Sequence, residues 1–139
     1  MTRPTIDELE MLNPFELGKL LINEIQMNSY DVQFIQDLIA VGCPINFRGA
    51  YDWTPLHHAA QSGHLEVLEL LLSNGADIHV RNSGGYTPLH YAVNWGDIEV
   101  VKFLISIGAD IEARNDANQT AWNIAHNSIR KAIPELRPI

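Results

Sequence analysis

The sequence is poor in basic residues and has a single cysteine. Of its 139 residues, 17 are acidic and 9 are basic, which gives a net charge of -8. Binding to a nucleic-acid backbone requires clustered Lys and Arg, so this composition argues against a nucleic-acid partner and favours a basic one. Cys43 cannot form an internal disulfide because the chain has no second cysteine.

Long hydrophobic runs are also missing. Apolar stretches such as "LLINEI" and "VLELLL" are interrupted by Asn or Glu, far short of the ~20 residues that span a bilayer. The opening "MTRPTIDELE" lacks the basic-then-apolar pattern of a secretory signal. We therefore expect no membrane segment and a cytoplasmic location.

The sequence does contain an internal repeat. "TPLHHAAQSGHLEVLELLLSNGAD" begins at Thr54, and "TPLHYAVNWGDIEVVKFLISIGAD" begins at Thr87, 33 residues later. The same offset aligns three further sets of positions: Thr54, Thr87 and Thr120; Gly42, Gly75 and Gly108; and Arg48, Arg81 and Arg114. A fixed period of this length is typical of arrays built from one supersecondary unit.

Each repeat predicts two short helices. Thr54 is suited to cap a helix that starts with Pro55 and runs to Gly63, because its hydroxyl can accept a hydrogen bond from a free amide. A second helix follows in "HLEVLELLLSN", before Gly75 as a left-handed cap. Its apolar stripe is Val67, Leu68, Leu71 and Leu72, and the next unit repeats it with Val100, Val101, Leu104 and Ile105. Helices this short need neighbours, which predicts an all-α solenoid.

The pattern resembles the ankyrin repeat. "TPLHHA" and "TPLHYA" match the T-P-L-H-x-A signature, and "GHLEVLELLLSNGADI" and "GDIEVVKFLISIGADI" match the second helix. The resemblance implies stacked helix-turn-helix units whose connecting loops form β-turn or hairpin fingers. It also implies that another protein binds the concave face formed by the fingers and the first helix of each unit.

We expect one domain over residues 1–139, with terminal units that deviate from the repeat because one side faces water. The expected divisions are an N-capping repeat over 14–46, full repeats over 49–81 and 82–114, and a truncated C-capping repeat over 115–139.

Both flanks also predict helices. Asn13, Pro14 and Glu16 have the spacing of a capping box, and Thr5 with Glu8 indicates one more short helical turn. In the C-terminal unit, Trp122 aligns with Leu56 and Leu89, which predicts a core residue. Pro134 should stop a shortened second helix.

The candidate site residues follow from the resemblance by alignment. They are Tyr51, Trp53, Gln61, Ser62, Ser83, Tyr86, Asn94, Trp95, Asp116 and Gln119; Ala50 and Gly84 lie on the same face, and Ala117 and Asn127 extend it together with Asp116 and Gln119. The aromatic rings are the main candidates because Tyr and Trp are enriched in binding hot spots. The alternative is that finger aromatics pack against the neighbouring finger or shield the first helix. His58 and Tyr91 lie at the edge, where partial burial is equally plausible.

The six histidines invite a metal hypothesis, which spacing argues against. His57 and His90 occupy the same position in successive units, and packed helices lie roughly 8–10 Å apart, too far for one zinc ion. The resemblance implies that this histidine hydrogen-bonds to frame the turn. His64 precedes a second helix, where Asp31 and Asp97 also stand, so we interpret it as a polar helix-start residue. We expect no metal and no cofactor.

Other reactive residues have structural interpretations too. Cys43 aligns with Ala76 and Ala109, which predicts a small buried position. Arg48, Arg81 and Arg114 should form a row at the finger bases, paired with acids such as Asp52 or Asp77. No nucleophile elbow, phosphate loop or zinc-protease motif is present, so an enzyme is not expected.

Two functions remain open beside a disfavoured enzyme or metal protein. The first is an interaction module that binds a partner protein through the concave face, with the molecule itself a monomer. The second is a freestanding acidic inhibitor, of the immunity type, that covers a basic enzyme such as a toxin or nuclease; the net charge of -8 favours it.

Overall fold

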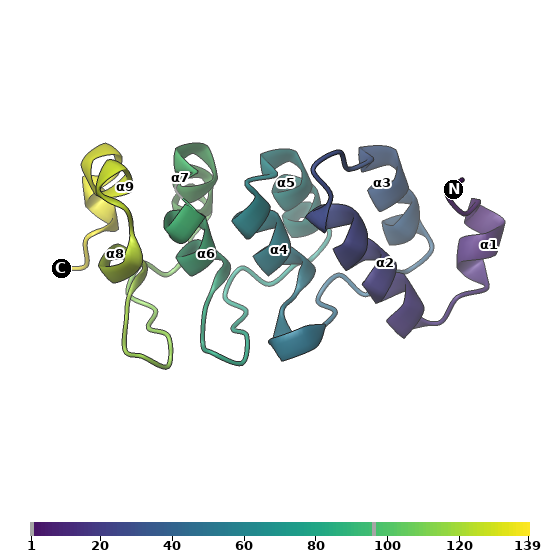
Figure 1. Ribbon diagram of the computed structural model, residues 1–139, viewed down its shortest axis with the longest axis horizontal. Helices are drawn as coiled ribbons and strands as arrows, with labels where there is room; N and C mark the ends of the chain where they lie inside the picture. The colour runs from purple at the N-terminus through teal and green to yellow at the C-terminus, as the bar shows by residue number, and fades with distance from the viewer. Residues whose placement is uncertain (1, 96) are drawn as a thin grey trace.

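The computed structural model describes residues 2–95 and 97–139 as a row of stacked helix pairs (Figure 1). In chain order the helices are α1 (Ile6–Glu10), α2 (Pro14–Gln26), α3 (Val32–Ala40), the 3-10 turn η1 (Ala50–Asp52), α4 (Pro55–Ser62), α5 (Leu65–Ser73), α6 (Pro88–Trp95), α7 (Ile98–Ser106), α8 (Ala121–Ile124), α9 (Asn127–Ala132) and the 3-10 turn η2 (Pro134–Leu136). The described residues include no β-strand. The predicted all-α stack of helix-turn-helix units is therefore confirmed.

None of these helices is suited to a bilayer. The longest, α2, has 13 residues. Across residues 2–95 and 97–139, no helix combines the length and apolar character needed to cross a membrane.

The predicted helix starts are confirmed. The Thr54 hydroxyl accepts a hydrogen bond from the His57 amide at the start of α4. Asn13 and Glu16 form a capping box at the start of α2, and Thr5 and Glu8 form another at the start of α1. Each box satisfies amides that have no partner within the helix itself, so short polar residues fix where these helices begin.

His64 differs from the expectation for a helix-start residue. Asp31 and Asp97 cap α3 and α7 through their carboxylates, whereas the His64 side chain makes no capping hydrogen bond to α5. Its ring instead packs against Tyr30, with 4.3 Å between ring centroids. An imidazole is bulky enough to gain more from packing on the adjacent unit than from bending back to the helix end.

Helix ends also follow the sequence. Gly63 ends α4 with φ of 72°, and Gly75 follows α5 with φ of 95°. Both lie in the left-handed region that favours glycine. At the C-terminal end, α9 stops at Ala132, shortly before Pro134, as predicted.

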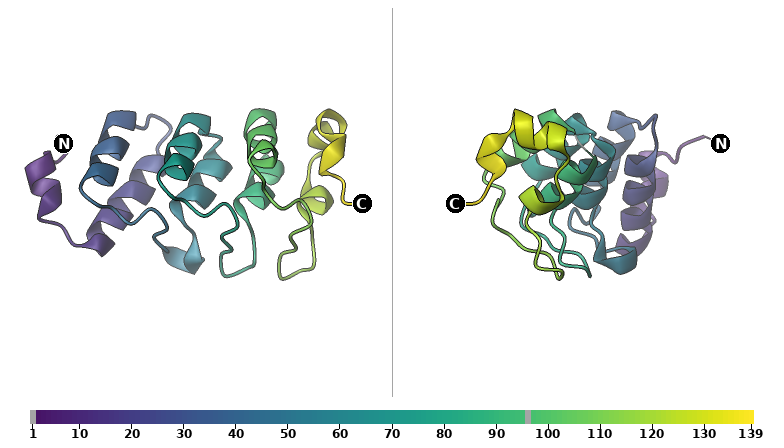
Figure 2. Two further views of the ribbon diagram at one scale, coloured as in Figure 1. Left: turned by 180° about the vertical axis from the view of Figure 1, so that it is seen from behind. Right: turned by 60° about the vertical axis from the view of Figure 1, so that its left-hand side comes forward.

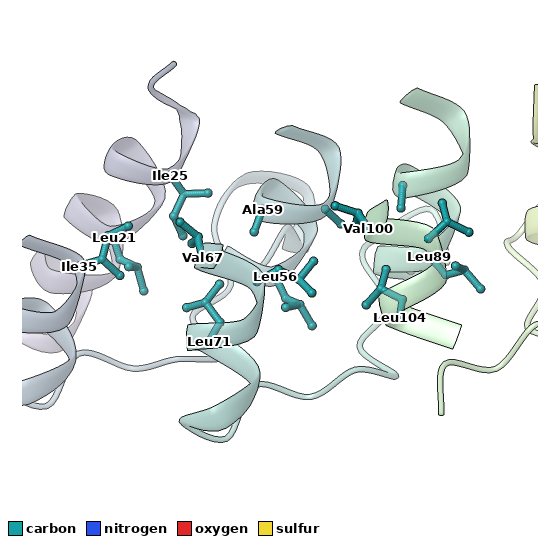
Figure 3. Packing of buried hydrophobic residues seen from close by; sticks show 14 of the residues in the cluster. Leu21, Ile25, Ile35, Leu56, Ala59, Val67, Leu71, Leu89, Val100 and Leu104 are labelled. Carbon is teal, nitrogen blue, oxygen red and sulfur yellow. The ribbon is translucent and has the colours of Figure 1, made fainter. Parts of the chain in front are cut away.

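Stacking buries the apolar stripes between successive units (Figure 3). Val67, Leu68 and Leu71 of α5 are fully buried, and Val100, Val101 and Leu104 of α7 repeat this pattern. The units meet chiefly through their first helices, since α4 packs against α2 and α6, and α6 packs against α8. The core is therefore one continuous layer along the stack rather than a central ball.

Trp122 is less buried than expected for a core residue. Leu56 and Leu89, at the aligned positions, are 1% and 2% exposed, whereas Trp122 is half-buried beside the core. The Arg130 guanidinium lies over its ring at 5.3 Å from the centroid. Among the described residues no further helix pair covers the far side of α8, so a charged side chain shields the ring instead.

The structure contains a buried charge near the N-terminus that the repeat pattern does not predict. Glu24 of α2 is 3% exposed, and both of its carboxylate oxygens accept hydrogen bonds from the Arg3 guanidinium. The Asp31 amide donates to the same carboxylate at 2.6 Å. Arg3 also lies over the Phe34 ring, 4.7 Å from its centroid. This cluster joins the segment before α1 to both α2 and α3.

Candidate binding face

The loops between units project to one side of the stack (Figure 2). We call residues 49–53, 82–86 and 115–119 the fingers, and the surface formed by the fingers with the first helices α2, α4, α6 and α8 the finger face. A backbone hydrogen bond closes each finger, from the amide of its first residue to the carbonyl of its last, at 2.8 to 3.1 Å. The expected turn-like fingers are therefore present.

An asparagine side chain organises the second finger from within. The Asn82 Oδ1 atom accepts hydrogen bonds from the amides of Gly84 at 3.1 Å and Tyr86 at 3.0 Å. Gly85 then takes φ of 76°, which completes a tight turn. Asn115 plays the same part in the third finger. These loops are shaped before any partner arrives, because their amides already have acceptors.

The first finger has a different internal structure. Gly49 replaces the asparagine and offers no side-chain acceptor. The loop forms a 3-10 turn in which Tyr51 and Asp52 have φ values of 55° and 60°. Two successive non-glycine residues in this region cost on the order of 1 kcal/mol each. The result places the Tyr51 ring outward, with 80% of its surface exposed.

Neighbouring fingers are joined by backbone hydrogen bonds. The Ser83 amide donates to the Tyr51 carbonyl at 3.0 Å, and the Asp116 amide donates to the Gly84 carbonyl at 3.0 Å. The two bonds are equivalent under the 33-residue offset. They fix the spacing between finger tips, so the finger face is one connected surface.

The arginine row at the finger bases is present, but its predicted partners are wrong. Arg48 donates to the Arg81 carbonyl at 3.0 Å, and Arg81 donates to the Arg114 carbonyl at 2.7 Å. Neither Asp52 nor Asp77 forms an ion pair in the described part of the chain; Arg81 instead lies 3.7 Å from Asp116. A guanidinium has several donors and can reach the carbonyl one repeat along, which single-unit reasoning does not anticipate.

His57 links one unit to the next. The Thr54 amide donates to His57 Nδ1 at 3.1 Å, so Nε2 carries the proton and donates to the Tyr86 carbonyl at 2.8 Å. Burial lowers the pKa of His57 to about 4. His90 repeats this arrangement with the Gln119 carbonyl at 2.9 Å, and burial lowers its pKa as well. The turn-framing role that the resemblance implied is therefore what these rings perform.

Trp53 and Tyr86 pack within the finger face instead of projecting from it. The Trp53 ring lies 4.2 Å from the Tyr91 ring and 4.8 Å from the His58 ring, between centroids. Tyr86 stacks on the other side of Tyr91 at 5.2 Å. Both candidates are half-buried. His58 is buried, and together these rings form a continuous aromatic wall across two units.

A hollow on the finger face lies between α2 and the first finger. It has a volume of about 690 Å³. We call it the first groove; it is lined by Phe15, Lys19, Ile22, Asn23, Gln26, Phe47, Arg48, Gly49, Ala50, Tyr51, Trp53, His58 and Gln61. Four of these, Ala50, Tyr51, Trp53 and Gln61, were placed on the binding face by the sequence. The α2 side was missed because the first helix of the N-terminal unit does not follow the repeat register, although Phe15 on a helix rich in apolar residues was a usable signal.

Two smaller hollows lie on the same face. One, of about 420 Å³, is lined by Asn28, Gln61, Ser62 and Trp95, and Gln61 also lines the first groove. The other, of about 290 Å³, is lined by Tyr86, His90, Tyr91, Asn94 and Ile124. Trp95, at the end of α6, is 64% exposed. The remaining candidates Ser83, Asp116 and Gln119 lie on the fingers and line none of these hollows.

The described residues hold neither a metal-binding cluster nor an exposed thiol. No group of three or more His, Cys, Asp or Glu side chains comes close enough to hold a metal ion within residues 2–95 and 97–139. Cys43 is 5% exposed, as its alignment predicted, and burial raises the pKa of its thiol to about 12. A thiol with that pKa is almost entirely protonated near neutral pH and is a poor nucleophile.

The comparison with known families agrees with this geometry. Residues 15–115 match the family model for ankyrin repeats, in three copies. The chain belongs to the ankyrin-repeat family. Ankyrin repeats are generally protein–protein interaction modules and are typically not enzymes. A search of curated proteins found no match.

Proposed function

We propose that this ankyrin-repeat protein binds a partner protein through its finger face. The observation that carries the proposal is the pair of exposed rings: Tyr51 is 80% exposed and Trp95 is 64% exposed. Each lines a hollow of that face. Rings of this kind gain a large contact area when a partner covers them, and they dominate many interfaces.

The pre-formed fingers support the same proposal. Backbone bonds join Ser83 to Tyr51 and Asp116 to Gly84, and His57 ties α4 to the following finger. A surface that is already ordered loses less conformational entropy when it binds. A structure that fixes its loops this firmly is suited to recognise one shape.

The proposed contact residues are the ten that the sequence indicated, divided by their surroundings. Tyr51 and Trp95 contact the partner with their rings, while Trp53 and Tyr86 support the surface from within. The polar contacts come from Gln61, Ser62, Ser83, Asn94, Asp116 and Gln119.

The net charge of -8 favours a more specific version, in which the protein is an acidic inhibitor of a basic enzyme. Long-range attraction would speed association, and that effect weakens as salt rises. An inhibitor abolishes its partner's turnover, whereas an adaptor leaves it intact. A turnover assay of the isolated partner with and without this protein distinguishes the two.

We also propose that the protein is a non-enzymatic monomer in the cytoplasm. Its repeats are proposed to cover residues 14–46, 49–81, 82–114 and 115–139. Cys43 supports a reducing compartment, since it is buried and has no second cysteine to pair with. Sedimentation of the purified protein measures its oligomeric state.

The test compares how tightly the partner binds to alanine variants of exposed apolar side chains on the finger face and away from it. Tyr51→Ala and Trp95→Ala should each weaken the partner's affinity at least about tenfold, the loss typical of a hot-spot residue. The control is Ile107→Ala, which removes an apolar side chain that is 43% exposed at the end of α7, away from the finger face. The partner is isolated by affinity capture on this protein, and titration calorimetry then gives its affinity for each variant. Equal affinity in all three variants would contradict the proposal.

A further inference from the structure

Charged side chains are distributed unevenly around the first groove. Its lining includes two cationic residues, Lys19 and Arg48, and no Asp or Glu. In a chain with 17 acidic and 9 basic residues this is the reverse of the average composition. Neither Lys19 nor Arg48 forms a salt bridge within the described residues.

Both cations are held at the groove. The Lys19 ammonium lies 5.2 Å from the centroid of the Phe15 ring. Arg48 uses one nitrogen, Nη1, to bond the Arg81 carbonyl, and a guanidinium has five N–H donors in all. The other donors of Arg48 remain for a bound group. An arginine fork is the side chain best matched to a carboxylate.

The rest of the lining combines apolar rings with carboxamides. Phe47 stands where the other units have Val80 and Ala113, and its ring rests on the α2 backbone at Gly18, where a methyl group would collide with it. Phe15 meets the Phe47 ring edge-on at 5.8 Å and is 61% exposed. Phenylalanine rings line this hollow, whereas neither of the two other hollows described on the finger face is lined by a phenylalanine.

The polar groups of the groove suit a peptide backbone. Asn23 and Gln26 on α2 and Gln61 on α4 line it, and each carboxamide can both donate and accept a hydrogen bond. His58 also lines the groove; it is 9% exposed, and its Nδ1 atom is buried without a hydrogen-bond partner in the described part of the chain. Peptide amides and carbonyls would match the three carboxamides, whereas a purely apolar ligand would leave them unsatisfied.

From this juxtaposition we infer that the first groove receives a partner segment carrying a bulky apolar side chain beside a carboxylate. The partner's apolar side chain enters between Phe15, Phe47 and Tyr51. The partner's carboxylate accepts hydrogen bonds from Lys19 and Arg48. The inference rests on the proposed function and assigns a chemistry to its partner. It also means that contact in the groove selects acidic segments even though the whole molecule is negative.

The test uses short synthetic peptides and fluorescence anisotropy. One peptide has a central Phe flanked by Glu, the second replaces each Glu with Lys, and the third replaces the Phe with Ser. The acidic Phe peptide should bind at least about tenfold more tightly than either of the others. Chemical-shift changes should centre on the indole of Trp53 and the side-chain amide of Gln61. Equal binding of the three peptides, absence of binding, or binding elsewhere on the molecule would overturn the inference.

Charge reversal checks the roles of the two cations. Lys19→Glu should remove the preference for the acidic peptide, while Lys102→Glu, an exposed lysine of α7 outside the groove, should retain it. Phe15→Ser should weaken the acidic and basic peptides alike. Retention of the preference by Lys19→Glu would refute the inference.

The affinity of the natural partner for the variants distinguishes a failure of this inference from a failure of the proposed function. If its affinity depends on Tyr51 and Trp95 but not on Lys19, the inference fails and the proposed function stands. If neither ring matters, the proposed function fails instead. Self-association that Lys19→Glu abolishes would identify a second copy of the chain as the occupant and overturn the inference.

Discussion

His57 and His58 are adjacent in α4 and both buried, yet only one has its hydrogen bonds satisfied. His57 accepts from the Thr54 amide and donates to the Tyr86 carbonyl. His58 packs against Trp53, and its Nδ1 atom has no partner among the described residues. One imidazole therefore joins two units, while the other contributes mainly a flat ring to the aromatic wall.

This contrast predicts different costs for the same substitution. His57→Leu should lower the free energy of unfolding by about 1–3 kcal/mol, because it leaves the Thr54 amide without a partner and removes one of the two hydrogen bonds that the Tyr86 carbonyl accepts. His58→Leu should change it by less than about 0.5 kcal/mol or raise it, because a buried polar atom without a partner is removed. Urea unfolding of the two variants measures both values. Equal destabilisation would show that packing, not hydrogen bonding, determines the cost.

At the scale of elements, the three fingers have one length and two internal structures. Asn82 and Asn115 each bond two amides of their own loop, whereas Gly49 cannot. The first finger therefore adopts a 3-10 turn, and Tyr51 is turned outward beside the first groove. The first finger differs from the other two because it has glycine in place of asparagine. It bears an exposed ring, whereas the other two are fixed by side-chain hydrogen bonds.

Glycine substitutions test how closely the fingers pack. Gly85 has φ of 76°, and a Cβ there would lie 2.5 Å from the Asp116 carboxylate and 2.6 Å from Arg81 Nη2. Gly75 has φ of 95° and nothing within 4 Å. Gly75→Ala should cost about 1 kcal/mol for backbone strain alone. Gly85→Ala should cost about 1–3 kcal/mol more, because the next finger must move.

Thermal and urea unfolding of both alanine variants provide the comparison. Amide exchange of Asp116, whose N–H bonds the Gly84 carbonyl, should also increase in Gly85→Ala and stay unchanged in Gly75→Ala. Equal stability of the two variants would mean that the fingers are not in firm contact.

At the scale of the whole molecule, stability and pH are coupled through histidines buried along the stack. The pKa values of His57 and His58 are lowered from 6.5 to about 4, and that of His90 is lowered too, in each case chiefly by burial. The unfolded chain binds protons that the folded chain excludes. Stability from this source is complete above pH 6.5 and is lost as the pH falls from 6.5 toward 4.

We expect acidification to destabilise the protein in that window. Between pH 7 and pH 5 His57 and His58 should each cost on the order of 1–2 kcal/mol, and His90 should act in the same direction. Neutralising part of the net charge of -8 acts in the opposite direction by reducing self-repulsion. Urea unfolding at high salt suppresses that second effect and isolates the histidines. His58→Leu should lose less stability than the wild type over the same range, and unchanged stability on acidification would contradict the expectation.

The sequence alone determined the repeating frame. Threonine caps, glycine ends and apolar stripes act within a few residues, so Thr54, Gly75 and Leu71 are enough to locate helices and their buried sides. The 33-residue offset between Thr54 and Thr87 then dictates that like units stack. Helix caps, apolar stripes and the fixed 33-residue period were therefore enough to predict the stacked architecture.

The tertiary structure decided which side chains meet across units. Arg48 reaches a carbonyl 33 residues away, Arg3 reaches Glu24, and Trp53 packs on Tyr91, and none of these pairs follows from spacing within one repeat. The first groove also required the structure, because α2 departs from the register and brings Phe15 into the same groove as Tyr51. Side-chain partners depend on distances between units, which a linear pattern does not contain.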